Sequence, residues 1–276
     1  LRELHAARFA PLLLPPSPPP PPPAWERSMF AHAQALREAV ARLPMRGALP
    51  PSRRRHSNCG AGADGEGDGT VVQLLVGTPA QIAELAASGA ADFAIATEGM
   101  EHFKDLIMMP CYEWNRAVVV PREHPLASKA EVPGSITLED IAEYPIVTYV
   151  FGFTGRSRLD DAFSAADLTP NVVFTATDTD VIKTYVRLGL GVGIIASMAY
   201  DEAQDADLGR IDAGRLCASS VTHIGFRRGT FLRRYMLDLI QSFAPHLESR
   251  TVAQAQECFT AVEREALFSS IELPIR

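Results

Sequence analysis

Small polar residues follow the apolar, strand-like runs of this sequence at several points. Thr97 and Glu98 follow "DFAIA", Thr154 follows "PIVTYVFGF", Thr177 follows "NVVFTA" and Ser197 follows "GVGIIA". In open α/β sheets, ligands bind beyond the carboxyl ends of the strands, near the N-termini of the next helices. Each of these residues alone is more often a simple helix cap. Four such strand ends in one chain favour a pocket for a small anionic or zwitterionic ligand.

The stretch "YVFGFTGRSRLDDAF" gives the clearest of these strand ends. Its apolar run breaks at Gly152. After Phe153, the hydroxyl of Thr154 is followed by a second glycine, Gly155, before a helical pattern begins. Such a loop presents backbone N–H groups and a neutral donor to an anion. Arg156 opens the helix, and it either neutralises a bound anion or is a solvated surface residue.

No arrangement of residues indicates a catalytic centre, a cofactor or a metal site. The four cysteines are far apart, the histidines lack ligand spacing, and HExxH, GxSxG and Walker-type motifs are absent. The glycine-rich segment "GLGVGIIAS" precedes its strand, so it is not a dinucleotide fingerprint. Trp114 either covers a ligand or fills the junction between two lobes. We therefore predict a binding protein without a cofactor and not an enzyme.

Charge and hydropathy limit the partners and the compartment. The chain of 276 residues has a net charge of −7, and all of its excess negative charge lies after residue 69. An acidic main body does not suit nucleic-acid binding. Because no apolar run is long enough to span a membrane, and "FAPLLLPP" is too short for a signal-peptide core, the sequence predicts a cytoplasmic protein without a membrane partner.

Residues 1–69 differ in composition from the rest of the chain. They contain twelve of the 21 prolines, six of them in a row, together with "RRRHSNCGAGADGEGDG" and no lysine. A polyproline run is extended, and a Gly/Asp tract buries too little apolar area to offset its chain entropy. We expect this Pro/Gly/Arg-rich segment to be disordered around one short helix, Phe30 to Leu43.

From Thr70 onward, short strands and helices alternate, which favours an α/β fold with mostly parallel sheets. Thr78, Pro79 and Gln81 have the spacing of a capping box that begins a helix. Residues 249–276 read as a weaker helical tail. Strands are predicted at "TVVQLLV", "DFAIAT", "LIMMPCY", "RAVVVP", "PIVTYVF", "NVVFTA", "GVGIIAS" and "THIGFR".

Several long segments carry a family resemblance. They are "GTPAQIAELAASGAADFAIATE", "MMPCYEWNR", "YPIVTYVFGFTGRSRLDDAF", "VFTATDTDVIKTYVRLGLGVGIIASMA" and "IGFRRGTFLRRYMLDLIQSFAPHL". In this order they resemble the effector-binding domain of the CysB and Cbl branch of the LysR-type transcriptional regulators, over residues 70–248.

The resemblance implies a two-lobed fold like that of type II periplasmic binding proteins, with a ligand between the lobes. Lobe I would comprise residues 70–111 and 220–248, and lobe II residues 112–219. The family senses sulfur status, so the implied effectors are sulfate, thiosulfate or O- or N-acetylserine. The family's anion contacts correspond to Thr97 and Thr154, with Gly152, Phe153 and Gly155 shaping the loop and Trp114 nearby; Arg156 and Thr177 complete the candidate set. The resemblance also implies a homo-oligomer, a dimer or a tetramer.

The N-terminal segment departs from the family pattern. A winged helix-turn-helix is not recognisable in residues 1–69, so promoter DNA and RNA polymerase are expected partners only where an intact one is present. The family's Thr-His-Thr-Gln anion motif has only a degraded counterpart in "AHAQA", where Gln34 fits and alanines replace both threonines. These residues resemble an out-of-frame or rearranged coding region, and lobe I would then lack its first strand.

The sequence therefore predicts a ligand-sensing domain of a regulator of sulfur assimilation and cysteine biosynthesis. Two alternatives stay open. One is a periplasmic solute-binding protein of the sulfate type, which would have the same architecture and a cleavable N-terminus. The other is a nonfunctional, truncated regulator.

Overall fold

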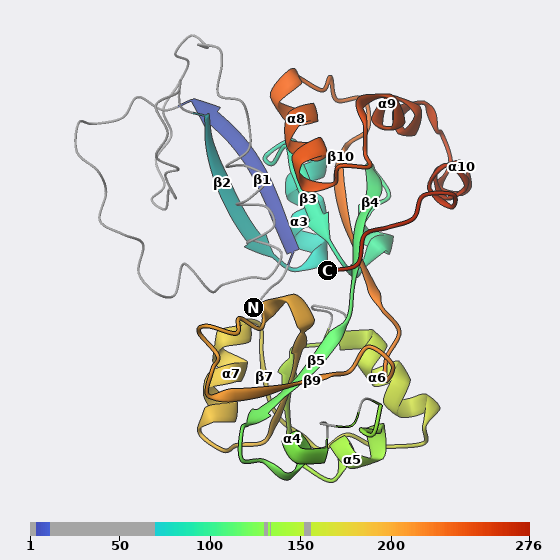
Figure 1. Ribbon diagram of the computed structural model, residues 1–276. Helices are drawn as coiled ribbons and strands as arrows, with labels where there is room; N and C mark the ends of the chain where they lie inside the picture. Colours follow the sequence, from blue (N-terminus) through green and yellow to red (C-terminus); the bar gives the residue numbers. More distant parts are fainter. Residues whose placement is uncertain (1–3, 12–69, 130–131, 133, 152–155) are drawn as a thin grey trace, which may run out of the picture.

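The computed structural model describes residues 4–11, 70–129, 132, 134–151 and 156–276 of the chain. Two lobes, each built on one five-stranded sheet, are joined by two extended crossings (Figure 1). The first crossing leads from β4 (Leu106–Trp114) to β5 (Arg116–Pro121), and the second from β9 (Leu208–Asp212) to β10 (Ser220–Arg227). The first sheet therefore continues to Trp114, beyond the boundary expected after Cys111.

Lobe I is built on the strand order β2-β1-β3-β10-β4, and every neighbouring pair is antiparallel. Its other strands are β1 (Leu4–Pro11), β2 (Thr70–Gly77) and β3 (Phe93–Ala96). Helix α3 (Pro79–Ala87) begins with the predicted capping box, in which the Gln81 N–H donates to Thr78 Oγ1 and the Thr78 N–H donates to Gln81 Oε1. The short η1 turn (Met100–Phe103) follows β3.

Strand β1 corrects the expectation for the N-terminal segment. Leu4–Pro11 pairs with β2 along its whole length and with β3 at His5 to Ala7. The prediction of a segment without strands is therefore wrong for these eight residues, and lobe I does not lack a strand at this place. Strand β1 lies between two strands, so its backbone N–H and C=O groups can form hydrogen bonds on both sides. Amino-acid composition alone does not reveal this pairing. The expected helix at Phe30 to Leu43 lies outside the described residues.

Lobe II is built on the strand order β7-β6-β8-β5-β9. Strand β6 (Ile146–Tyr149) runs parallel to β7 (Val172–Ala176) and to β8 (Val192–Ala196), whereas β5 is antiparallel to β8 and β9. The helices of this lobe are α4 (Pro125–Lys129), α5 (Leu138–Ala142), α6 (Arg156–Ala165) and α7 (Thr179–Arg187), with the η2 turn (Ser197–Ala199) after β8.

The expectation of mostly parallel sheets is wrong for the described strands. Parallel pairing is confined to β6 with its two neighbours. The chain leaves lobe I through β4 and returns through β10, which lies beside it, so these two strands must run in opposite directions. The direction of a strand in the sheet therefore depends on how the two lobes are connected. The sequence pattern of one strand does not reveal that connection.

Each lobe has its own hydrophobic core. In lobe I, Phe93, Ile107, Trp114 and Phe226 belong to one buried cluster against α8 (Arg234–Phe243). The rings of Phe93 and Phe226 are perpendicular and meet edge to face, with 6.5 Å between their centroids. In lobe II, a second cluster includes Phe163 of α6. The cores meet where Ala196, Met198 and Ala199 of lobe II join the lobe I cluster, so movement of the lobes as units about the crossings must keep or break this contact.

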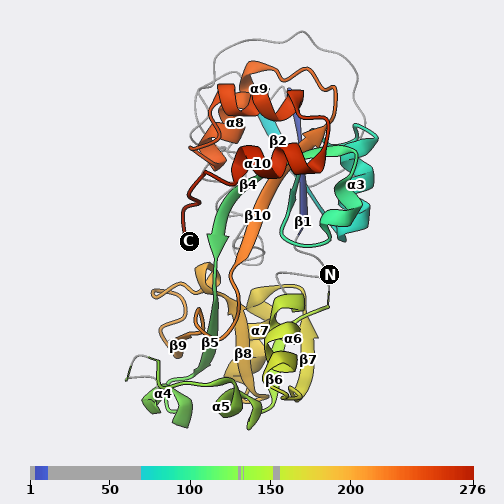
Figure 2. The same ribbon diagram turned by 90° about the vertical axis from the view of Figure 1, so that its right-hand side faces the viewer.

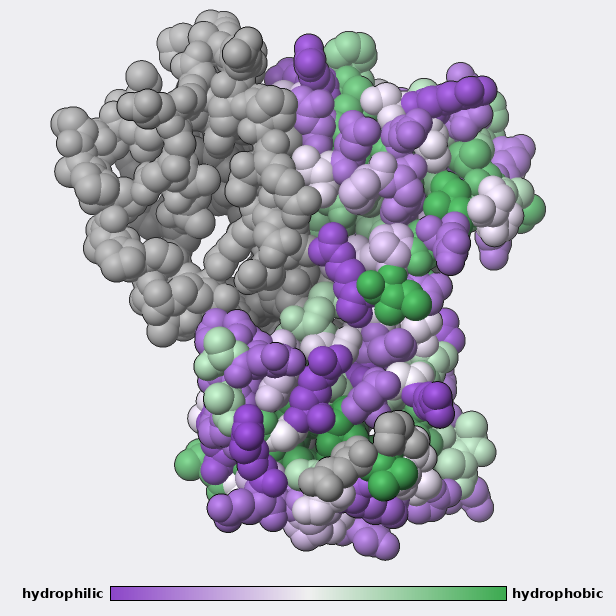
Figure 3. Space-filling view, viewed as in Figure 1, coloured by the Kyte–Doolittle hydropathy of each residue, from purple (hydrophilic) through white to green (hydrophobic). Residues whose placement is uncertain are grey.

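The residues after lobe I form two helices, α9 (Ser249–Glu257) and α10 (Ala261–Phe268), as the prediction of a helical tail anticipated. Both lie over lobe I, and the chain then descends beside β4 toward the crossings (Figure 2). The face seen in Figure 3 is mostly hydrophilic where residues are described. Among the helices of the described ranges, we find none with the length and apolar character needed to cross a membrane.

Candidate functional site

Residues on facing edges of the two lobes are joined by a direct contact. Glu98, just beyond β3 in lobe I, accepts a hydrogen bond from Ser157 Oγ at 2.8 Å and a second from the Ser157 N–H at 3.3 Å. Ser157 lies in the first turn of α6 in lobe II. The end of β3 and the beginning of α6, 59 residues apart in sequence, therefore meet where the lobes touch, and we call them the lobe I and lobe II walls.

The Glu98 carboxyl group is electrostatically unusual. Burial raises its pKa above the ordinary value, although the two bonds from Ser157 and the charges of Arg116 and Arg158 act in the opposite direction. Its second oxygen, Oε2, is buried and has no hydrogen-bond partner in the part of the chain that the structure describes. A carboxyl group in this state can accept a hydrogen bond from a ligand when ionised, or donate one when protonated.

The carboxyl ends of the parallel strands in lobe II converge on a polar network. The Tyr149 hydroxyl, at the end of β6, lies 2.7 Å from Thr179 Oγ1 and accepts a hydrogen bond from the Ala196 N–H at 3.2 Å. Ser197, at the end of β8, donates its N–H to Asn115 O in the crossing at 2.8 Å. These ends are the place where α/β sheets hold ligands, and here they face the crossings.

Arg116 places a buried positive charge at the junction of the two lobes. It is 3% exposed, and its guanidinium donates to Ala218 O and Ser220 Oγ, both at 3.1 Å, so it links the two crossings. It also lies 5.3 Å from the centre of the Trp114 ring. Burial lowers its pKa, but an arginine remains charged at neutral pH. The junction therefore contains a buried positive charge, which also acts on the nearby Glu98 carboxyl group.

The predicted site residues fall into two groups. Thr97, Arg156, Trp114 and Thr177 are described, whereas Gln34, Gly152, Phe153, Thr154 and Gly155 lie outside the described residues. Thr97 is half-buried beside Glu98, on the lobe I wall. Trp114 is fully buried in the lobe I core next to Arg116, as the packing interpretation expects.

Arg156 and Thr177 have local structural contacts. Arg156 donates to Tyr149 O at 2.8 Å and to Asp160 Oδ1 at 2.9 Å, so it is neither a simple solvated residue nor wholly available to a ligand. Thr177 is half-buried beyond β7, and the cap of α7 is Asp178, whose side chain accepts from the Asp180 N–H. Both residues nevertheless lie on the strand-end edge of lobe II.

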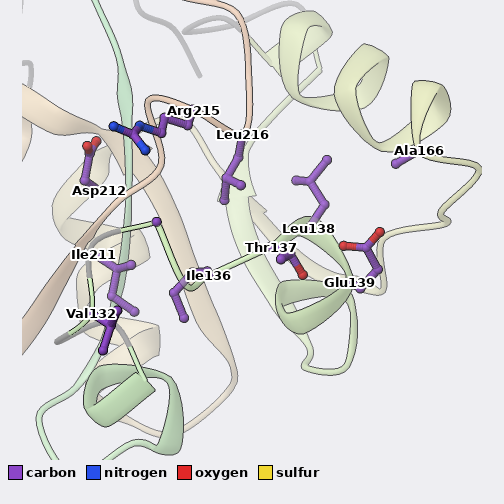
Figure 4. A pocket seen from close by; sticks show the side chains of 11 residues that line it. Val132, Ile136, Thr137, Leu138, Glu139, Ala166, Ile211, Asp212, Arg215 and Leu216 are labelled. Carbon is purple, nitrogen blue, oxygen red and sulfur yellow. The ribbon is translucent and has the colours of Figure 1, made fainter.

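A separate pocket lies within lobe II and does not involve the predicted residues. It encloses about 500 Å³ between the α5 region and the end of β9 (Figure 4). Ile136, Leu138, Ile211 and Leu216 give it an apolar lining, with Asp212 and Arg215 at its edge. No described residue of the interlobe walls contributes to it.

The described residues show neither a metal site nor a reactive cysteine. Three or more His, Cys, Asp or Glu side chains do not gather in these ranges as a metal site would require. Cys111 and Cys217 are buried free thiols, and burial raises the pKa of both. The geometry suits the binding of a small polar ligand.

The family is shown by comparison with known proteins. Residues 66–248 match the family described as the LysR substrate binding domain. The chain belongs to this family. It is 53% identical over 197 residues to the HTH-type transcriptional regulator CysB of Haemophilus influenzae, covering 71% of this chain and 59% of that protein. It is also 49% identical over 180 residues to the regulator SsuR of Burkholderia cenocepacia, covering 65% of this chain and 57% of that protein.

A third relative is the regulator cbl of Escherichia coli, 40% identical over 165 residues, 60% of this chain and 51% of that protein. The chain thus spans between about half and three fifths of the length of these three relatives. The crystal structure of the cofactor-binding domain of the Cbl regulator superposes with a TM-score of 0.60 at 37% identity, over 66% of this chain and 78% of that one.

A more distant structure, the effector-binding domain of QuiR in complex with shikimate, has a TM-score of 0.52 at 16% identity over 62% of this chain and 78% of that one, which supports the fold alone. The predicted family and the two-lobed α/β effector-domain fold are both confirmed. The relatives named above are transcriptional regulators, in agreement with the prediction that the chain is not an enzyme.

Sequence reasoning missed Arg116 and Ser157. A signal for Arg116 was available, because a single charged residue opens the otherwise apolar run "RAVVV", and a charge at such a position needs a partner when buried. Ser157 has no comparable signal, since a serine in the first turn of a helix is ordinary.

Proposed function

We propose that this chain is the ligand-sensing part of a LysR-type transcription regulator of sulfur assimilation and cysteine biosynthesis. It binds sulfate, thiosulfate, or O- or N-acetylserine between the lobes. Ligand binding changes the relative population of lobe arrangements, and contacts between subunits transmit that change to DNA-binding domains. The protein acts in the cytoplasm as a homo-oligomer.

The observation that carries this proposal is the contact between Glu98 and Ser157 across the lobes. Glu98 is the neighbour of Thr97, and Ser157 follows Thr154 by three residues. Three residues span at most about 10 Å. The contact therefore supports a shared site for the two threonines, with neutral hydroxyl and amide donors that suit an oxyanion.

The buried charge of Arg116 supports the anionic class of ligand, and the names of the CysB, SsuR and cbl relatives support the sulfur-related role. Glu98 limits the choice further. An ionised carboxylate repels a dianion but suits an ammonium or amide donor, so sulfate requires Glu98 to be protonated or turned away, whereas O-acetylserine does not.

Calorimetric titration of the full chain with sulfate, thiosulfate, O-acetylserine and N-acetylserine at modest salt tests the proposal. Thr97→Ala and Thr154→Ala are each expected to weaken binding by about fivefold to thirtyfold, because each removes a hydrogen bond to a charged group. Thr169→Ala, at an exposed position in lobe II, is the matched control and should bind like the unchanged chain. Equal affinity in all three variants would refute the assigned site.

A further inference from the structure

The chain segment after α10 ends beside β4, next to the first crossing between the lobes (Figure 2). The Glu113 N–H donates to Pro274 O at 2.9 Å, and the Arg276 N–H donates to Glu113 O, also at 2.9 Å. Glu113 and Ile275 thereby form a parallel β-bridge. Strand β4 is at the edge of the described sheet of lobe I, so these residues add a partner where β4 ends.

The same segment also reaches lobe II. Ser197 Oγ lies 3.4 Å from Arg276 O, to which it donates. The guanidinium of Arg276 lies 4.6 Å from the centre of the Tyr112 ring in lobe I. Arg276 therefore contacts β4 through its backbone and side chain, and contacts the end of β8 through its carbonyl oxygen. One residue touches both lobes at the point about which they would bend.

Glu113 connects this segment to the second crossing as well. Its side-chain Oε2 accepts a hydrogen bond from Ser219 Oγ at 3.1 Å. The backbone of Glu113 therefore binds residues 274–276, while its side chain binds the chain returning to lobe I. Hydrogen bonds of Glu113 thus connect three chain segments: β4, residues 274–276 and the second crossing.

The segment is anchored at its other end. Leu267 and Phe268 of α10 pack against the main core cluster of lobe I. Between this anchor and Glu113 the chain is short, and Pro274 restricts its backbone, so little conformational entropy is lost when its two hydrogen bonds form.

We propose that residues 274–276 act as a strap that restricts bending between the two lobes. When the angle between the lobes changes, either the strap moves with them or its contact with one lobe breaks. The strap thereby sets how easily the unliganded protein samples other lobe arrangements. This role rests on the contacts at the crossings and is independent of which ligand binds.

The test is amide hydrogen exchange of the full chain without ligand, compared with a variant lacking residues 270–276 and with Arg276→Pro. The Pro substitution removes the N–H that binds Glu113 O. Ile275→Ala is the matched control, because the Ile275 side chain is 73% exposed. The reporting amides are those of Ser157, which donates to Glu98 across the lobes, and Ala213, which donates to Arg116 O between the two crossings. Neither residue contacts the strap in the hydrogen bonds given above.

We expect the Ser157 and Ala213 amides to exchange about fivefold to tenfold faster in the deletion and in Arg276→Pro. Ile275→Ala and the core amides of lobe II should be unchanged. Faster exchange at Glu113 alone would show that the segment only covers the edge of β4, and the strap would be refuted. Uniformly faster exchange throughout lobe I would also refute it, because the segment would then stabilise lobe I as a whole.

Discussion

Removing the hydroxyl of Ser157 should weaken ligand binding without destabilising either lobe. Ser157→Ala eliminates the 2.8 Å hydrogen bond to Glu98 and leaves only the 3.3 Å bond from the Ser157 N–H. Hydrogen bonds to charged groups contribute about 1.5–3 kcal/mol, and the half-buried position of Glu98 places this one near the lower value. Because the bond joins the lobes, its loss disfavours the arrangement with this contact, here called closed, by about 1–2 kcal/mol.

A ligand that binds the closed arrangement should then have a Kd about fivefold to thirtyfold higher, since 1.4 kcal/mol corresponds to a factor of ten. Calorimetry with the ligand that binds the unchanged chain measures this ratio. Ser164→Ala is the control, because Ser164 is exposed on the same helix. A Kd within twofold of the unchanged chain for Ser157→Ala, or an equal loss in Ser164→Ala, would show that the interlobe contact does not govern closure.

Three further predictions concern stability. Asp205→Ala should cost about 3 kcal/mol in urea unfolding, because Lys183, whose side chain is 6% exposed, loses its 2.7 Å ion pair and keeps only the 3.1 Å pair with the more exposed Asp180. Burial lowers the pKa of His223 to about 4, so the unfolded chain binds a proton first as pH falls. The contribution of His223 should therefore lower stability by about 3 kcal/mol between pH 6.5 and 4, and His223→Gln should reduce the slope in this range. Gly191→Ala should prevent lobe II from folding, because its Cβ would lie 2.1 Å from Pro145 O, and a loss of less than 1 kcal/mol would contradict that geometry.

The pH dependence of ligand binding gives a fifth prediction. Because burial raises the pKa of Glu98, its carboxyl group is protonated at higher pH than an exposed glutamate. Sulfate affinity should therefore increase as pH falls through that pKa, and Glu98→Gln should bind sulfate with little pH dependence in this range. Titrations at several pH values measure both. An unchanged pH profile in Glu98→Gln would remove Glu98 from the site.

Local signals in the sequence predicted local structure well. The capping residue Thr78 begins its helix as expected, because a cap depends on residues within one turn, and of Thr177 and Asp178, which were both possible from the sequence, Asp178 caps α7. Strand β9 was not predicted, since its sequence "LGRID" has a glycine and two charged residues and is held mainly by its pairing with β5.

Contacts between residues far apart in the sequence could not be predicted from local sequence patterns. The antiparallel direction of β10 beside β4 and the bond between Glu98 and Ser157 join residues more than fifty positions apart. The strand-end rule nevertheless selected Thr97, the neighbour of Glu98 at the lobe contact, and Ser197, which lies beside the crossings. That rule follows from sheet geometry and needs no knowledge of the partner strand.

The adjacency of β4 and β10 has a consequence for how the protein is made. Lobe II is an insertion whose two ends leave lobe I from neighbouring strands, so all of lobe II leaves the ribosome before β10 can complete the lobe I sheet. Lobe II is thus able to fold first. The first half of lobe I stays incomplete, with exposed strand edges, until β10 is synthesised. Trp114 and Ser220 are paired across these strands, so a short linker joining them should yield lobe I alone. It should also shorten the time for which the lobe I sheet is incomplete during synthesis.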